Sequence, residues 1–341
     1  MCALSRSRQR NAVKHPRCFI LKSEFALIKR YFDRPPPKGF DGVGDDCALL
    51  PIPAGQHLAT TTDMLLEGRH FLSGADPARL GHKALAVNLS DLAAMGAQPL
   101  GCLLGLALPS VDHTWLSHFS EGFHALAAQS GCPLVGGDTT RSTSGIVISV
   151  TAMGHVDRSL ALRRSAAQVG DDIWVSGFLG AADVALDLIE GRLPADADLL
   201  AATRTALEMP RPPLRFAPQL CGVAHAALDI SDGLAQDLGH ILKASQCGAD
   251  LQYELMPIDP ALATLHPDRQ RKAVLSGGDV YQLCFTAPPD RHSQIKKLAR
   301  AADVRVTQVG RITAEPGLRI YDGQGQLIHL ESGGFDHFSG S

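Results

Sequence analysis

The chain has 341 residues, of which 45% are hydrophobic and 20% are charged. This length favours two domains that each bury their own core, and this composition excludes an intrinsically disordered protein. The net charge of -3 provides no general positive field, so we expect neither a nucleic acid nor an anionic membrane as partner. The longest apolar run, 100–111, contains two glycines and a proline and is about half the length that a bilayer requires.

The cysteines and the basic start of the chain bear on its location. The eight cysteines are scattered and form no C-x-x-C pair, which argues against a zinc knuckle and a disulfide framework. A reducing, cytoplasmic location fits this pattern best. Residues 1–22 carry six basic side chains and no acid. We interpret them as a disordered extension or as the result of an upstream start codon, with a nucleic-acid arm as the less favoured alternative.

The first elements are a helix and an acidic turn. Apolar spacing predicts a helix over 24–32, which stops at the prolines that follow. The segment 42–50 reads GVGDDCALL, so Asp45 and Asp46 leave a glycine turn directly before an apolar run. With no lysine or arginine nearby, a distant basic side chain or a hard cation such as Mg²⁺ has to neutralise them. Taken alone, such a pair is more often a solvated turn than a metal site.

A strand and a long helix come next. The threonine-rich segment 57–62 predicts a strand with Asp63 at its end. A helix is predicted over 76–96, with an aspartate as N-cap and a proline in its first turn. Its spacing places Asn88 and Asp91 on one face with apolar residues. An acid on such a face needs a partner, and a buried ion pair or hydrogen bond explains it as well as a ligand does.

The first domain is predicted to close with three more elements. A strand at 102–108 precedes a helix that is N-capped near Asp112. A short strand at 133–135 then runs into GGDTTR at 136–141, and a strand at 146–156 ends the domain. A strand followed by small residues and a carboxylate therefore occurs again.

The second half repeats this design. The strand at 224–228 leads into Asp229-Ile230-Ser231-Asp232-Gly233, so carboxylates again follow a strand. The other predicted elements are a strand at 173–176, a glycine-rich helix start at 177–180, a proline-rich connector at 210–213, a helix through Lys243, a helix ending at 276–279, a strand at 281–286 and a hairpin near Asp322.

Repeated acids are the strongest chemical signal. They lie at strand ends or on an apolar helix face, at Asp45, Asp46, Asp63, Asp91, Asp138, Asp229 and Asp232. Converging carboxylates stay ionised only around bound cations, and Mg²⁺ completes its shell with water and substrate phosphates. The pattern therefore favours a nucleotide phosphate as substrate. P-loop, Rossmann, protein-kinase and zincin motifs are absent from the sequence.

Together the motifs resemble the thiamine-monophosphate kinase family, in the superfamily of aminoimidazole ribonucleotide synthetase and selenophosphate synthetase. NLSDLAAMGA with GGDTTR is typical of the superfamily, whereas LDISDGL and the tail GFDHF favour the kinase branch. The resemblance runs from about 24 to 338 and rests on GVGDDCALL (42–50), TTTD (60–63), KALAVNLSDLAAMGA (83–97), GGDTTR (136–141), LDISDGL (228–234), SGG (276–278) and GFDHF (334–338).

The resemblance implies an α/β (mixed α+β) protein with the two-domain fold of aminoimidazole ribonucleotide synthetase. An N-terminal domain, expected at 23–156, would bind Mg-ATP and dimerise through its sheet. A C-terminal domain, expected at 157–338, would complete the substrate cleft. The implied partners are ATP, thiamine monophosphate and a second copy of the chain.

Site residues follow from the same resemblance, motif by motif, with no covalent nucleophile or general base among them. Several Mg²⁺ ions would be held, in part through water, by Asp46, Thr61, Thr62, Asp63, Asp91, Asp138, Asp229 and Asp232. ATP would contact Gly137, Asp138, Arg164 and Ser231. Thiamine monophosphate would contact His70, Asp279 and Phe335.

One segment departs from the family pattern. After SGG and Asp279 the family usually has two further acids, at the positions of Val280 and Gln282 in this chain. We therefore expect two carboxylates to be missing on the substrate side, with weaker substrate binding or a different substrate as the consequence.

The leading hypothesis is ATP-dependent phosphorylation of thiamine monophosphate to thiamine diphosphate, the final step of thiamine diphosphate biosynthesis. The substrate phosphate would attack the γ-phosphorus of ATP directly and in line. Two alternatives stay open: another ATP-dependent enzyme of the superfamily with a different acceptor, and a Mg-nucleotide-binding regulator that has lost catalysis, which the missing acids suggest.

Overall fold

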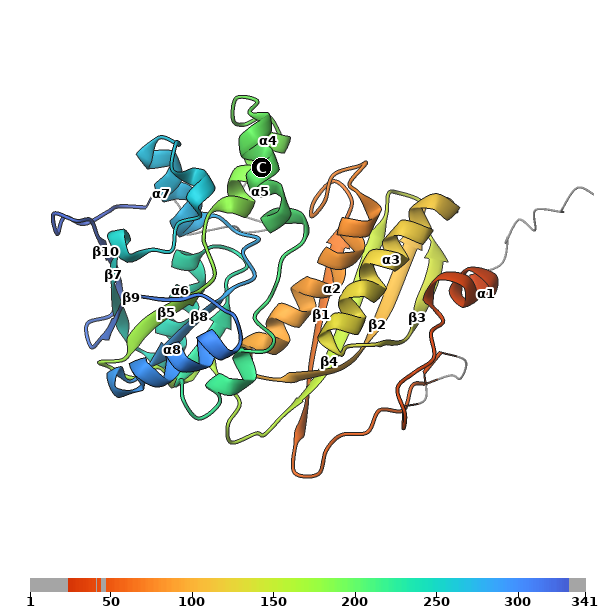
Figure 1. The fold of residues 1–341 in the computed structure, drawn as a ribbon, viewed down its shortest axis with the longest axis horizontal. Coiled ribbons are helices and arrows are strands. Elements are labelled where there is room, and N and C mark those ends of the chain that lie inside the picture. Colours follow the sequence, from red (N-terminus) through yellow and green to blue (C-terminus); the bar gives the residue numbers. More distant parts are fainter. Residues whose placement is uncertain (1–23, 41, 44–46, 331–341) are drawn as a thin grey trace, which may run out of the picture.

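The computed structural model describes residues 24–40, 42–43 and 47–330. Two sheets with their helices lie side by side in it (Figure 1), which confirms the expected mixed α+β class. The predicted basic extension lies outside the described residues. Within the described part of the chain, no helix combines the length and the apolar character that crossing a membrane requires.

The first sheet has four strands in the order β1-β4-β2-β3. β4 runs antiparallel to β1 and β2, while β2 and β3 are parallel. Buried and half-buried residues alternate strictly along β4, so the described residues bury only one face of this sheet fully. Helices α2 and α3 cover that face (Figure 1). The elements are β1 (His57–Leu66), α2 (Pro77–Ala94), β2 (Gln98–Leu108), α3 (His113–Ser130), β3 (Leu134–Arg141) and β4 (Val147–Val156).

Helix caps and two glycines explain how α2 and α3 form and pack. The Asp76 side chain accepts a hydrogen bond from the backbone of Arg79 at 3.0 Å, which confirms the predicted start of α2. The helices then approach very closely. A Cβ on Gly81 would lie 2.1 Å from the carbonyl oxygen of Phe119, and one on Gly122 would lie 1.8 Å from that of Ala78. Only glycine fits at these two positions.

The second sheet has six strands in the order β10-β7-β9-β5-β8-β6. Ile173 and Val175 of β5 pack on one face with α6, whereas Trp174 packs on the other face with Ile295 of α8. The elements are β5 (Asp172–Ser176), α4 (Ala181–Ile189), α5 (Ala197–Glu208), β6 (Ala226–Asp229), α6 (Leu234–Ser245), β7 (Gly248–Gln252), α7 (Pro267–Ser276), β8 (Leu283–Ala287), α8 (His292–Ala301), β9 (Val306–Thr313) and β10 (Gly317–Tyr321).

The two halves share an apolar core. Ala93 and Ala94, at the end of α2, pack in one cluster with Trp174, Phe216 and Leu220 of the second half. The position of α2 against the second sheet is therefore set by buried contacts. Because β4 ends at Val156, we propose to divide the chain there, into domains at 23–156 and 157–338.

The sequence patterns located most elements but not all of their limits. The predicted first helix is α1 (Glu24–Leu27), which continues as a π-helix over Ile28–Phe32. β1 extends beyond the predicted strand, so Asp63 lies inside it and pairs with Val150 of β4. The predicted hairpin near Asp322 is present, with β10 leading into it and Tyr321 paired antiparallel with Leu327. Helices α5 and α8 and strands β7 and β9 are additional to the predicted elements.

Candidate active site

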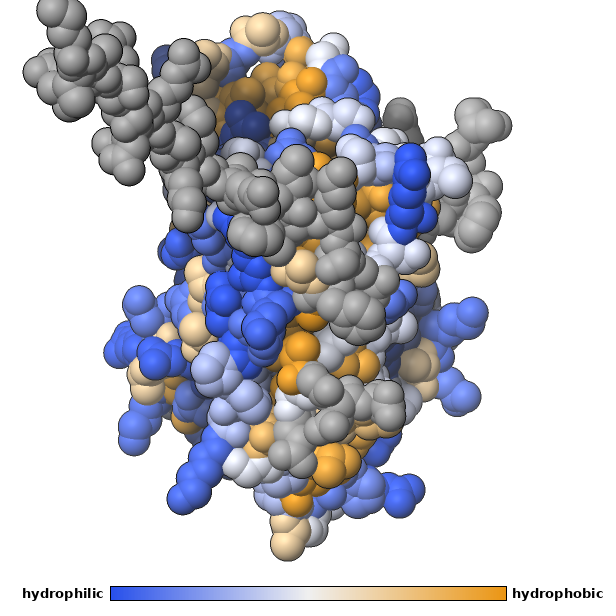
Figure 2. Space-filling model, turned by 90° about the vertical axis from the view of Figure 1, so that its right-hand side faces the viewer, coloured by the Kyte–Doolittle hydropathy of each residue, from blue (hydrophilic) through white to orange (hydrophobic). Residues whose placement is uncertain are grey.

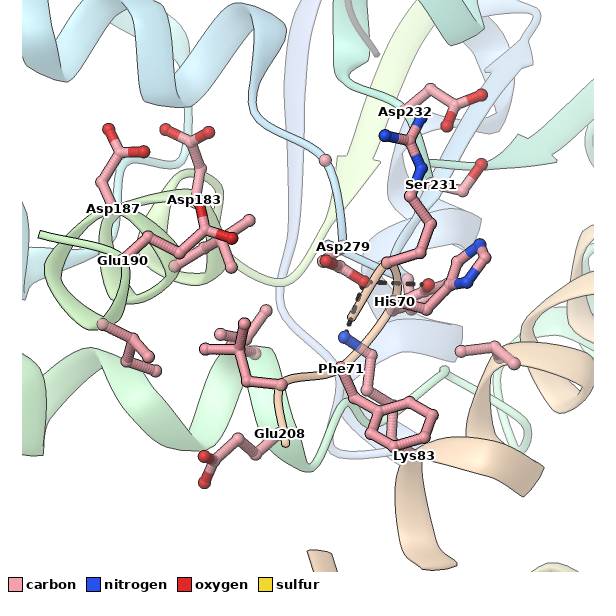
Figure 3. Close-up of a pocket in the computed structure, with 18 of the residues that line it drawn as sticks. His70, Phe71, Lys83, Asp183, Asp187, Glu190, Glu208, Ser231, Asp232 and Asp279 are labelled. Atoms are coloured by element: carbon pink, nitrogen blue, oxygen red, sulfur yellow. Dashed lines mark hydrogen bonds and ion pairs between the residues drawn. The ribbon is translucent and has the colours of Figure 1, made fainter. Parts of the chain in front are cut away.

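A cavity of about 1530 Å³ lies between the two domains. Its first-domain wall comes from β1, the loop after β1, and α2, and its second-domain wall comes from the loop after β6, the loop after α7, and helices α4, α5 and α7. In Figure 3, Asp183 and Asp187 of α4 and Glu190 directly after it lie across the cavity from Ser231 and Asp232. The predicted site residues among its lining are Thr62, Asp63, His70, Asp91, Asp229, Ser231, Asp232 and Asp279.

A second cavity of about 610 Å³ lies on the other side of the predicted acids. Thr61, Arg164 and the end of β6 contribute to its wall. Asp91 and Asp229 line both cavities. These two carboxylates therefore stand where the two spaces meet, which is the position required to contact ligands bound on either side.

Hydrogen bonds hold the acids in place. Thr61 Oγ1 donates to Asp91 Oδ2 at 2.5 Å, and Ser90 Oγ donates to Asp229 Oδ2 at 2.8 Å. The backbone N–H of Asp63 donates to Asn88 Oδ1 at 3.1 Å. Strand β1, helix α2 and strand β6 thus bring together three acids that lie far apart in the sequence.

Burial raises the pKa of each of these carboxyl groups. Burial, reinforced by the charge of Asp91, raises the pKa of Asp63 to about 6. The same two causes raise the pKa of Asp229, which is 5% exposed, to about 7. Burial also raises the pKa of Asp91, although the hydrogen bond from Thr61 and the charge of Arg164 oppose this. A bound cation would offset the repulsion between these carboxylates and favour their ionised forms.

The donor atoms fit a hydrated Mg²⁺ ion better than a metal held by protein alone. Carboxylate and hydroxyl oxygens are the ligands that Mg²⁺ prefers. Among the described residues, however, no three His, Cys, Asp or Glu side chains are grouped closely enough to hold a metal. An ion here would keep water and take further oxygens from a ligand, as Mg²⁺ usually does.

The loop after β6 is shaped by an acid that sequence reasoning left without a role. Asp237 Oδ2 accepts backbone hydrogen bonds from Ser231, Asp232 and Gly233 at 3.0, 3.0 and 3.1 Å. Burial raises the pKa of Asp237 to about 6 despite these donors. Asp237 is part of the motif LDISDGLAQDLGHI, but the motif does not show that its side chain points back to the loop after β6.

Three predicted residues on the first sheet lie away from the acid cluster. Thr62 Oγ1 donates to the carbonyl oxygen of Val150 at 3.1 Å and accepts from Thr151, so it occupies the uncovered face of β1. Asp138 is exposed on the edge strand β3 and belongs to the lining of neither cavity. Its neighbour Gly137 is also exposed.

Two other predicted site residues, Asp46 and Phe335, lie outside the described residues. Among the described ones, His70 follows β1 and its Nδ1 accepts a hydrogen bond from the backbone of Leu66 at 3.0 Å. Asp279 follows α7, and its Oδ1 lies 2.8 Å from the Lys83 ammonium (Figure 3). Lys83 was not among the predicted site residues.

Comparisons with known proteins agree with this architecture. Residues 44–156 match the model described as AIR synthase related protein, N-terminal domain, and residues 168–323 match AIR synthase related protein, C-terminal domain. Thiamine-monophosphate kinase of Escherichia coli strain K12 is 42% identical over 324 residues, which cover 93% of this chain and 98% of that one. The chain belongs to the thiamine-monophosphate kinase family.

Solved structures of the family support the same conclusion. Thiamine-monophosphate kinase from Stenotrophomonas maltophilia K279a matches with a TM-score of 0.77 at 46% identity, covering 84% of this chain and 91% of that chain. AaThiL complexed with AMPPCP and TMP matches with a TM-score of 0.74 at 27% identity, covering 92% of this chain and 97% of that chain. The predicted two-domain fold is thereby confirmed.

Val280 and Gln282, which stand where the family usually has acids, do not face the substrate side as expected. Neither Val280 nor Gln282 belongs to the lining of either cavity, whereas Asp279 and Tyr281 do line the larger one. Val280 packs against the apolar core of the second domain. Gln282 accepts a hydrogen bond from Ser176 Oγ at 2.8 Å and donates one to the carbonyl oxygen of Arg211 at 3.0 Å. The expectation that acids are missing on the substrate side is therefore wrong, because alternate residues of this segment face opposite ways.

Proposed function

We propose that this chain transfers the γ-phosphoryl group of ATP to thiamine monophosphate and so forms thiamine diphosphate. The observation that carries the proposal is the position of Asp91 and Asp229 between two cavities. Phosphoryl transfer between two ligands requires that both ligands bind next to the same charged groups. The related E. coli protein bears the name of this activity, and AaThiL forms a complex with AMPPCP and TMP.

For this transfer the protein mainly has to position the two phosphate groups and to neutralise their negative charge. The acceptor phosphate is largely ionised near neutral pH, so a general base contributes little and no covalent intermediate is needed. Two anions must be held in line, and Arg164, which lines the smaller cavity, contributes fixed positive charge. Several Mg²⁺ ions, when bound, would neutralise the remaining phosphate charge.

We assign the ligand contacts by position. Several Mg²⁺ ions would be held, in part through water, by Asp63, Asp91 and Asp229, with Thr61 orienting Asp91 through its hydrogen bond. The family motif adds Asp46, Thr62, Asp138 and Asp232. Arg164 and Ser231 would contact ATP together with Gly137 and Asp138. His70, Asp279 and Phe335 would contact thiamine monophosphate.

A homodimer would give the uncovered sheet face a partner. Met64, Ser149, Gly105 and Asp138 form one row across this face in the observed register. Exposed apolar side chains of β1, namely Leu58, Met64 and Leu66, stand on the same strand. Figure 2, which views the molecule from the first-domain end, shows apolar patches between polar ones on that end. Docking a second copy here would bury Asp138 and Gly137 in an interface, where they could reach a bound nucleotide.

We also propose a cytoplasmic location for the protein. Free thiols such as those of Cys47 and Cys221 fit a reducing compartment.

Product analysis tests the proposal directly. The purified full-length protein is incubated with ATP, Mg²⁺ and thiamine monophosphate, and the products are identified by mass spectrometry. We expect ADP and thiamine diphosphate in equal amounts. ADP formed only with a different phosphorylated or carboxamide acceptor would assign the chain to another reaction of the superfamily, and ATP binding without turnover would leave a regulator.

A further inference from the structure

One lysine connects the two domains at the cavity wall. Lys83 lies on α2, its side chain is only 7% exposed, and its ammonium is 2.8 Å from Asp279 Oδ1 in the second domain. An ammonium is rarely enclosed to this extent without an anionic partner, because losing its hydration is costly. The pair therefore joins α2 to the segment 278–282 (Figure 3).

The segment that carries Asp279 has an unusual backbone. Asp279 and Tyr281 both have positive φ angles, of 58° and 52°, which side chains other than glycine rarely adopt. Two hydrogen bonds hold the segment against the loop after β6: Asp279 N donates to the carbonyl oxygen of Ser231 at 2.8 Å, and Tyr281 N donates to that of Ile230 at 2.7 Å. A backbone of this kind persists only where its surroundings fix it.

Tyr281 adds a second donor to the same carboxylate. Its hydroxyl donates to Asp279 Oδ1 at 3.0 Å. Burial and the negative charge of Asp279 raise the pKa of Tyr281 well above its usual value, so the phenol stays protonated and can only donate to this carboxylate. Both donors engage the same oxygen, Oδ1, so the other oxygen of Asp279 keeps its capacity to bind a ligand in the cavity.

We propose that Lys83 is a positioning residue for the acceptor end of the site. Its ammonium fixes the carboxylate of Asp279, and with it the backbone of 278–282, at the wall of the larger cavity. The identity of the acceptor rests on the proposed function, whereas the positioning itself does not.

Other contacts of α2 with the second domain do not reach this segment. Arg79 pairs with Glu208 of α5 at 2.6 Å, and His82 Nε2 lies 2.8 Å from the carbonyl oxygen of Pro210. Both contacts hold the region around α5 and the connector that follows it. Replacing Lys83 alone therefore releases Asp279 while the remaining contacts keep the domains together.

Kinetics of matched variants form the first test. Lys83→Met removes the ammonium, Lys83→Arg keeps the charge, and Lys297→Met removes an exposed lysine on α8 as control. For Lys83→Met we expect KM for thiamine monophosphate to rise about tenfold, the effect of losing one charge-assisted hydrogen bond, with KM for ATP unchanged. Lys83→Arg should recover part of the loss, and the control should match the natural protein.

A double variant separates positioning from direct contact with the ligand. If Lys83 acts through Asp279, then Lys83→Met added to Asp279→Asn should change KM for thiamine monophosphate less than about twofold further. A full additional loss in the double variant would mean that the ammonium binds the ligand itself. A fall in kcat without a change in KM for either substrate would point to a merely structural role. Either result overturns the proposal.

Hydrogen exchange of the ligand-free protein tests the same idea without any activity. We expect the amides of Asp279 and Tyr281 to exchange about tenfold faster in Lys83→Met and in Asp279→Asn than in the natural protein or in Lys297→Met. Unchanged exchange at both amides in both variants contradicts the proposal. If the natural protein does not phosphorylate thiamine monophosphate, the proposed function fails, while this measurement still decides the role of Lys83.

Discussion

Ser90 Oγ donates a 2.8 Å hydrogen bond to Asp229 Oδ2 and so links α2 of the first domain to the end of β6 in the second. The next residue on α2, Asp91, accepts a hydrogen bond from Thr61 of β1. Two neighbouring residues of one helix therefore connect it to a strand of each sheet. This arrangement places the acid cluster at the joint between the domains, where the relative position of the domains sets the spacing of its carboxylates.

The first prediction concerns Asp91. We expect Asp91→Asn to lower kcat by at least about a hundredfold, because it removes a charge that faces both cavities and would bind Mg²⁺. The metal-free variant should fold and should be somewhat more stable than the metal-free natural protein. The charge of Asp91 raises the pKa of both Asp63 and Asp229, so removing it relieves repulsion between the carboxylates. Steady-state kinetics and thermal unfolding measure the two effects.

The matched control for this substitution is Asp112→Asn. Asp112 caps α3 through hydrogen bonds from the backbones of Thr114 and Trp115 at 2.8 and 3.1 Å, and asparagine caps a helix about equally well. This variant should keep its activity. Near-normal turnover by Asp91→Asn would remove the acid from the metal site.

The second prediction concerns Gln282. We expect Gln282→Glu to give no gain in kcat and to lower the free energy of unfolding by about 1–3 kcal/mol, because a carboxylate cannot donate to the carbonyl oxygen of Arg211. Denaturant unfolding and product formation are measured on the same preparation. A rise in activity in this variant, or in Val280→Asp, would restore the view that these positions face the substrate.

The chemistry of the site could be predicted from motifs more fully than its geometry. The cap at Asp76 and the apolar spacing of α2 placed Asn88 and Asp91 on one inward face, and hydrogen bonds to β1 reach both side chains. The ion pair between Lys83 and Asp279 lies outside any local pattern, because the partners are far apart in sequence and meet only when the domains dock.

Two other features of the site could not be predicted from the sequence. The directions of Val280 and Gln282 depend on two left-handed residues, Asp279 and Tyr281, that no periodicity predicts. The position of Asp138 depends on strand order, since β3 lies at the far edge of the sheet from β1. Motif matching groups residues by chemistry, and it cannot distinguish those that meet within one chain from those that do not.

The third prediction tests the close approach of α2 and α3. We expect Gly122→Ala to lower the free energy of unfolding by about 1–3 kcal/mol, because the new methyl group would collide with the backbone of Ala78 and overpack the interface. Gly239→Ala in α6 is the control. Apart from its chain neighbours and the backbone of its own helix, no described atom would lie within 4 Å of its Cβ, so the better helix propensity of alanine should stabilise the protein by up to about 1 kcal/mol. Equal effects of both variants in denaturant unfolding would argue against the packing account.

The fourth prediction follows from the raised pKa values of the acid cluster. The folded-state pKa is about 6 for Asp63 and about 7 for Asp229, against a usual value of 3.8. Both groups thus bind protons more tightly in the folded chain than in the unfolded chain, so the free energy of unfolding of the metal-free protein should fall as pH rises from about 4 to about 7. Above this window their unfavourable contribution is complete and constant. Thermal unfolding in the presence of a chelator measures this slope.

Magnesium should reverse this loss of stability at neutral pH. An ion that binds only the folded protein adds about 2.7 kcal/mol at a free concentration one hundred times its Kd. Since protons compete with the cation for the same carboxylates, the gain should be largest near neutral pH and should vanish below about pH 4. Asp91→Asn should show a smaller gain than the natural protein. A gain that is equal in both proteins and independent of pH would place the bound ion away from these acids.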